Sequence, residues 1–265
     1  MIEIIIILLI GIGAGLMVGI MGGSGVMVVV PMLTLLLGFQ IHAAIGTSLL
    51  IDVIATVITS IIYHRHHNIY VKPGLWIAAG SVVGAQAGSA FASMIPSIGM
   101  SNLFGLMLIP MGILLGVRGI QRTPKGPENS TPDNTAMMPV QTRKQQITAL
   151  GLGVLVGVMC GLFGAGGGGM ILIILIFVLR YPVHVAVGTS SFIMMITAAS
   201  GTAGYILQGH IDVYAAIIAS VPTLLTASLG ATVANRVSEK TLGRIIGVVL
   251  TSLGVIMIAA QYLIA

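Results

Sequence analysis

Two glycine-rich clusters interrupt the apolar sequence and have the chemistry of an anion site. They read GGSG from Gly22 to Gly25 and GAGGGG from Gly164 to Gly169, and a short apolar segment follows each. The first N–H groups of a helix have no intrahelical partner and lie at the positive end of the helix dipole, so they attract oxyanions. The clusters therefore predict two backbone anion sites, with a tight interhelical turn as the alternative. The candidate residues are Gly22, Gly23, Ser24, Gly25, Gly166, Gly167 and Gly168.

A second polar motif, GTS, adds hydroxyl groups in both halves of the chain. It spans Gly46 to Ser48 and again Gly188 to Ser190, near the expected start of a helix. Such hydroxyls either cap the helix or donate hydrogen bonds to an anion, and the sequence leaves both uses open. The hydroxyl-bearing candidates are Thr47, Ser48, Thr189 and Ser190.

Asp52 is the one acidic residue deep in an apolar segment, one helical turn after Ser48. A carboxylate in such a place is costly and suggests a function, such as the uptake and release of a coupling proton. A structural, hydrogen-bonded role is the alternative.

An enzyme is the least favoured interpretation of these residues. The GGSG cluster fits the serine motif of intramembrane rhomboid proteases, but Ser24 would need a histidine base, and no histidine lies in the middle of an apolar segment. The second cluster has Gly166 at the corresponding position, so the backbone matters more there than a hydroxyl. Cys160 is the single cysteine, which excludes an internal disulfide and a cysteine metal cluster. We expect no metal and no cofactor.

The composition is that of a membrane protein. Of the 265 residues, 57% are hydrophobic and 6% are charged, and apolar runs fill most of the chain. The net charge of +5 comes from a few Lys and Arg residues between these runs, so it indicates membrane orientation and not a nucleic-acid surface.

The chain consists of two copies of one unit. Shifting the sequence by 142 positions places Gly11 on Gly153, His42 on His184, and the first GTS triplet on the second. A repeated polar triplet and histidine exceed chance apolar similarity. We predict a first membrane repeat over 1–118, a flexible linker over 119–146 and a second membrane repeat over 147–265. Helical segments are expected at 2–20, 25–38, 43–63, 74–94 and 98–117, and at 147–163, 168–180, 183–207, 213–234 and 243–263.

The distribution of charge predicts that the two repeats have inverted topology. If the first two segments of each repeat return to their own side or cross twice, each repeat crosses an odd number of times, and every Lys and Arg lies on one face. By the positive-inside rule that face is cytoplasmic, together with the linker, while both termini are non-cytoplasmic. The expected fold is an all-α polytopic membrane protein with two inverted repeats of about five helical segments and glycine-broken helices, an architecture typical of secondary transporters.

In these motifs the chain resembles the sulfite exporter TauE/SafE family, formerly a family of unknown function. The similarity lies in GGSGVMVVVP followed by GTS, both recurring after a polar central loop, and it covers essentially the whole chain. The chain departs from this pattern at two positions. Ile173 stands where the second repeat would have a proline equivalent to Pro31, and Ser24 stands where a glycine is usual. The resemblance implies transport of sulfite or organosulfonates across the cytoplasmic membrane of a prokaryote.

We therefore expect a secondary transporter of sulfur-containing oxyanions that alternates access by rocking, with Asp52 as the candidate for proton coupling. A passive anion channel at the same site is the alternative. The expected partners are a small anionic substrate and the lipid bilayer, with no nucleic acid, and faces of small residues leave room for a homodimer.

The inverted topology predicts that Lys72 and Arg236 lie on the same face of the membrane. Single cysteines introduced at these two positions should react with a membrane-impermeant thiol reagent from the same side. Reaction from opposite sides would contradict the inverted arrangement.

Overall fold

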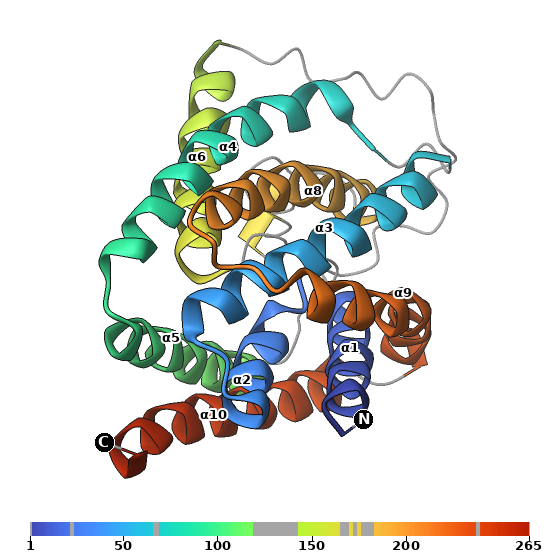
Figure 1. The fold of residues 1–265 in the computed structure, drawn as a ribbon. Coiled ribbons are helices and arrows are strands. Elements are labelled where there is room, and N and C mark those ends of the chain that lie inside the picture. Colours follow the sequence, from blue (N-terminus) through green and yellow to red (C-terminus); the bar gives the residue numbers. More distant parts are fainter. Residues whose placement is uncertain are drawn as a thin grey trace.

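The helices of the protein follow the apolar segments of the sequence. A computed structural model describes residues 2–21, 24–65, 69–118, 143–164, 170–171, 174–175, 183–236 and 239–264. These residues form helices and no strand, which confirms the predicted all-α class (Figure 1). The helices are α1 (Ile2–Met21), α2 (Val26–Leu37), α3 (Ile41–Arg65), α4 (Val71–Met94), α5 (Ser97–Arg118), α6 (Arg143–Phe163), α8 (Val183–Leu207), α9 (Val213–Arg236) and α10 (Glu239–Ile264).

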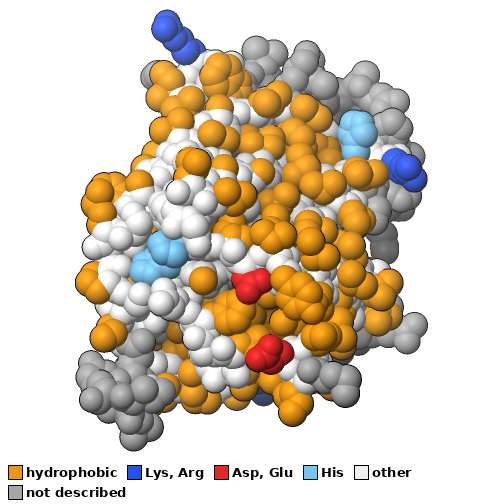
Figure 2. All heavy atoms as spheres, viewed as in Figure 1, with side chains coloured by type: hydrophobic (Ala, Val, Ile, Leu, Met, Phe, Trp, Pro, Cys, Tyr) orange, Lys and Arg blue, Asp and Glu red, His pale blue; other side chains and the backbone are white. Residues whose placement is uncertain are grey.

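Four of these helices are long and apolar enough to cross a membrane. Their spanning parts are Ile41–Arg65, Gly74–Met94, Gln146–Phe163 and Gly188–Leu207, and shorter apolar helices accompany them. Many large hydrophobic side chains are exposed, and Figure 2 shows them over most of one face with few charged groups among them. An apolar surface of this extent is suited to lipid tails, so the chain is a polytopic membrane protein.

Helix boundaries recur at the offset of the sequence repeat. Helix α8 begins and ends 142 positions after α3, and α9 does the same relative to α4. Helix α6 begins at Arg143, before the apolar run from Ile147, because Arg, Lys and Gln are good helix formers. The expected segment 168–180 and the linker residues 119–142 lie outside the part that the structure describes, apart from short pieces near 170–175.

The four helix pairs with the most extensive contacts each join a helix of one repeat to a helix of the other. Helix α1 packs on α9 and α4 packs on α6, so these two pairs are equivalent under the repeat. Helix α3 packs on α8 and α5 packs on α10, so these two pairs combine corresponding helices (Figure 1).

Corresponding helices run in opposite directions. In the α3–α8 pair, Gly46 lies beside Tyr205 while Leu49 lies beside Gly201, so the two helices are antiparallel. In the α5–α10 pair, the glycines at 105 and 112 lie beside those at 254 and 247, again in antiparallel order. An inverted repeat requires this antiparallel relation between corresponding helices.

Glycines at every fourth position bring the α4–α6 pair into backbone contact. Gly153 and Gly157 of α6 face the backbone of Ile77 and Ser81, and a Cβ atom at either glycine would overlap a carbonyl oxygen of α4. Small residues permit this close approach, which stabilises helix pairs in lipid.

The α1–α9 pair repeats the same contact. Gly11 and Gly15 face Ala219 and Thr223, which are the copies of Ile77 and Ser81. The Thr223 hydroxyl also donates to the carbonyl oxygen of Gly11 at 2.9 Å. The glycines of this spacing therefore serve packing.

We predict that Gly157→Ala destabilises the protein whereas Gly151→Ala, on the same helix, does not. The added methyl group at Gly157 overlaps the Ser81 backbone, and such overpacking costs about 1–3 kcal/mol. Gly151 is exposed and has open space around it, so alanine there adds only helix propensity. Thermal unfolding of both variants in detergent tests the difference, and equal midpoints would contradict the close α4–α6 contact.

Candidate functional site

The chain reverses direction at the first glycine-rich cluster. Gly25 packs against Ala14, and Gly13 lies beside Val28, so α2 folds back along α1. Helix α2 has 12 residues and is about 18 Å long, which is less than the hydrocarbon core of about 30 Å. It ends at Gly38, which has the left-handed conformation (φ +67°) typical of a helix C-terminus.

Asp52 accepts hydrogen bonds at the start of α2. The Ser24 hydroxyl donates to its Oδ2 at 2.7 Å and the Gly25 N–H donates to its Oδ1 at 3.2 Å. The Val26 N–H in turn donates to Ser24 Oγ at 3.4 Å. The carboxyl group thus occupies the position at which an anion binds a helix N-terminus.

This cluster is enclosed in protein near the middle of α3. Ser24 is 7% exposed and Asp52 is 1% exposed. Asp52 lies about halfway along the 25 residues of α3, and α3 is one of the four candidate spans. If α3 spans the membrane, the break is near the midplane, where lipid would leave its backbone groups unsatisfied and the protein must satisfy them.

The second cluster begins beside the first. Gly164 has φ +64°, and a Cβ atom there would lie 3.2 Å from Val26 and 3.4 Å from the Ser48 hydroxyl. Its N–H donates to Cys160 in the last turn of α6 at 2.7 Å. The two breaks therefore meet at the start of α2. The predicted residues Gly22, Gly23, Gly166, Gly167 and Gly168 lie outside the described residues.

The two GTS threonines lie at opposite ends of the α3–α8 pair. Thr47 accepts the N–H of Asp212 at 3.0 Å, and Thr189 accepts the N–H of Tyr70 at 3.1 Å. Asp212 immediately precedes α9 and Tyr70 immediately precedes α4. Each threonine therefore accepts a hydrogen bond from the repeat to which it does not belong. A hydroxyl that accepts one hydrogen bond still has a proton to donate.

The GTS serines are fully buried, as the threonines are. Ser48 donates to the carbonyl oxygen of Ile45 at 2.7 Å and faces Gly164. Ser190 is fully buried in α8. Of the candidates in the two motifs, the structure thus places Ser48 beside the start of the second cluster and one helical turn from Asp52, and it separates the threonines from each other.

Tyr205 adjoins the candidate site, although neither motif contains it. Its hydroxyl, buried in α8, donates to the carbonyl oxygen of Gly161 at 3.0 Å, just before the second break. It thereby satisfies a carbonyl group near the end of α6. The signal for it was present in the sequence, because Tyr63 occupies the same position in the first repeat.

Two histidines meet at the end of the bundle that carries the α8–α9 connection. The ring centroids of His42 and His210 are 5.4 Å apart, and His42 Nε2 donates to the Ala92 carbonyl oxygen at 2.9 Å. Burial, and secondly the neighbouring His42, lower the pKa of His210. A cavity of about 460 Å³ lies beside them, lined by Phe39, Gln40 and the connection from Gly209 to Val213.

Within the described residues no group of three His, Cys, Asp or Glu side chains is placed to hold a metal ion. The partner of Ser24 is a carboxyl group and not an imidazole. The arrangement places backbone N–H groups, hydroxyls and one carboxyl group in a buried interior, which suits reversible binding of an anion or a proton.

Comparisons with known proteins identify a family of membrane transporters. The family model for Sulfite exporter TauE/SafE matches residues 7–257. The chain is similar to the probable membrane transporter proteins YunE and YdhB of Bacillus subtilis: YunE is 27% identical over 95% of this chain and 96% of its own, and YdhB is 30% identical over 83% and 86%. A probable membrane transporter protein of Methanocaldococcus jannaschii is 26% identical over 97% of both chains. No solved structure matches the chain significantly.

We predict that Ser24→Ala lowers the free energy of unfolding by about 1–3 kcal/mol, because a buried carboxyl group loses a donor. The control is Ser93→Ala, which changes an exposed hydroxyl bonded within its own helix and should shift stability by less than about 0.5 kcal/mol. Chemical unfolding in detergent measures both. In an Asp52→Leu background the Ser24→Ala effect should shrink, and strict additivity would contradict the hydrogen bond.

Proposed function

Because the chain belongs to the sulfite exporter TauE/SafE family, we propose that it is a secondary transporter of sulfur-containing oxyanions such as sulfite or organosulfonates. The observation that carries the proposal is the meeting of two backbone breaks beside Asp52 in the middle of α3. Neutral N–H and O–H donors hold an anion weakly enough to release it, and binding sites of secondary transporters lie at such discontinuous helices.

The proposed substrate site comprises the two clusters and the adjoining hydroxyls. In the first cluster these are Gly22, Gly23, Ser24 and Gly25, and in the second Gly166, Gly167 and Gly168. Ser48 faces the meeting point of the breaks, whereas Thr47, Thr189 and Ser190 belong to the helices that surround it.

The charges of the chain support an inverted arrangement with a cytoplasmic linker and non-cytoplasmic termini. Antiparallel packing of α5 on α10 puts Arg118 and Arg244 at the same end of that pair. Asp212 bonds to Thr47 near the start of α3, whereas Arg65 closes the last turn of α3. Arg65 and Asp212 thus lie at opposite ends of α3, and the positive-inside rule assigns the ends that carry Arg65, Arg118 and Arg244 to the cytoplasm.

Asp52 is the proposed coupling residue. Its carboxyl group is bonded to the start of α2, so a change in its protonation alters the contact that holds the two breaks in place. An anion that enters the same N-terminus meets repulsion from a carboxylate and less from the neutral acid. Because the anion binds beside the Asp52 carboxyl group, protonation of Asp52 favours binding of the anion, and binding of the anion favours protonation.

Proteoliposomes test the proposal by uptake measurements with sulfite, thiosulfate, sulfoacetate, sulfate and a carboxylate at matched concentrations. We expect saturable uptake of one of the sulfur oxyanions that responds to a pH gradient. Asp52→Asn should remove the response to the gradient. The matched control is Asp212→Asn at the start of α9, where asparagine also caps a helix, and the response should persist.

Two outcomes would contradict the proposal in different ways. Flux without saturation and without a response to the gradient would indicate a passive anion channel. Saturable uptake of carboxylates but of no sulfur oxyanion would contradict the substrate class and leave the transport mechanism in place.

A further inference from the structure

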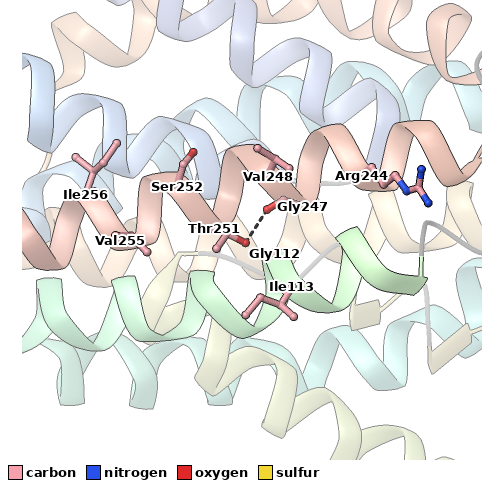
Figure 3. A pocket seen from close by; sticks show the side chains of 9 residues that line it. All are labelled: Gly112, Ile113, Arg244, Gly247, Val248, Thr251, Ser252, Val255 and Ile256. Atoms are coloured by element: carbon pink, nitrogen blue, oxygen red, sulfur yellow. Dashed lines mark hydrogen bonds between the residues drawn. The ribbon is translucent and has the colours of Figure 1, made fainter.

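A groove between α5 and α10 runs along the outside of the helix bundle. It has a volume of about 680 Å³ and is lined by Gly112 and Ile113 of α5 and by one face of α10 between Arg244 and Ile256. Figure 3 shows Arg244 at one end of this row of side chains, with Val255 and Ile256 toward the other end.

The wall of the groove is apolar although it contains two hydroxyl residues. The Thr251 hydroxyl donates to the Gly247 carbonyl oxygen at 2.7 Å (Figure 3). The Ser252 hydroxyl donates to the Val249 carbonyl oxygen at 2.9 Å. Each hydroxyl thus bonds within its own helix, and exposed Ile113 and Val248 complete an apolar wall.

We propose that this groove binds one acyl chain of an anionic glycerophospholipid, with the lipid phosphate on the Arg244 guanidinium. The rise of α10 from Arg244 to Ile256 is about 18 Å. One leaflet contributes about half of a hydrocarbon core of about 30 Å. The groove therefore has the length of a single leaflet, and Arg244, the cation among its described lining residues, lies at one end, where a headgroup would lie.

The two ends of the helix pair differ in charge, which points to an anionic ligand at one end only. The repeat relates Arg244 to Asn102 of α5, which carries no charge, and Ser252 to Pro110. The α5–α10 pair is antiparallel, so these counterparts lie toward its opposite end. An acyl chain needs no charged partner, whereas a phosphate needs a positive charge. The Arg244 end of the helix pair supplies that charge and the Asn102 end does not.

A lipid fits the groove better than a second copy of the chain. Helix α5 contains no acidic residue and α10 contains only Glu239, and the whole chain has six, of which Asp52 is buried. A second copy therefore offers Arg244 few carboxylates, whereas every phospholipid of the leaflet offers a phosphate. A bound lipid would contact α5 of one repeat and α10 of the other, and so would stabilise the pair.

Native mass spectrometry of the purified protein tests the site with phosphatidylglycerol and phosphatidylcholine of identical acyl chains. We expect preferential retention of phosphatidylglycerol, and Arg244→Gln should weaken its binding about fivefold, the effect of roughly 1 kcal/mol per basic residue at a membrane surface. Arg143→Gln is the matched control, because Arg143 is an exposed arginine at the start of α6, and it should leave binding within about twofold.

Ser252→Phe is a second variant that fills the groove without removing a charge. It should reduce retention of both lipids while the thermal unfolding midpoint shows that the protein is folded. Equal retention of both lipids with no effect of Arg244→Gln would overturn the proposal, and so would full competition by glycerol phosphate, which would indicate a free-anion site. A change from dimer to monomer in Ser252→Phe with lipid retention intact would also overturn it, because the occupant would then be a second copy.

Discussion

The fold depends on one constraint: backbone N–H and C=O groups that are freed by a helix break have no water to bond to inside a bilayer. The start of α2 meets this constraint with hydrogen bonds from Gly25 and Ser24 to Asp52, and Tyr205 bonds a carbonyl group just before the second break. Each of these partners lies on α3 or α8. The central pair of helices therefore supplies the polar groups that the broken helices require, and the other helices enclose that pair.

Close packing across the repeats follows from the same requirement. Helices exclude lipid from the breaks only if they approach closely, and glycines at every fourth position allow backbone contact in the α1–α9 and α4–α6 pairs. Both pairs combine helices of different repeats. In the proposed transporter, a rocking movement that kept these contacts would carry helices of both repeats together, so its moving parts would not be the two sequence repeats themselves.

Much of this architecture follows from the sequence, because its signals are periodic. The spacing of Gly153 and Gly157 predicts a packing face, and the offset of 142 positions predicts the bounds of α8 and α9 from those of α3 and α4. The sequence does not predict which helix packs on each glycine face, because a stripe of small residues can pack on any similar stripe. The bond between Ser24 and Asp52 also escaped sequence reasoning, because nothing local links residues that are 28 positions apart. Thr47 and Thr189 occupy the same position in the two copies of the GTS motif. Antiparallel packing of their helices nevertheless places them at opposite ends of the α3–α8 pair.

The symmetry of the chain fails at its centre. The repeat assigns Met194 to the position of Asp52 and Gly166 to that of Ser24, so the second copy lacks both members of the hydrogen-bonded pair. Met194 is fully buried in α8, and an apolar side chain makes no polar contact there. In the proposed transporter, two identical breaks would bind an anion equally from either side, whereas one carboxyl group beside one break would make the two states of a rocking cycle unequal in energy. As the proposed coupling residue, a single buried Asp52 would also limit proton exchange at this point to one proton per transport cycle.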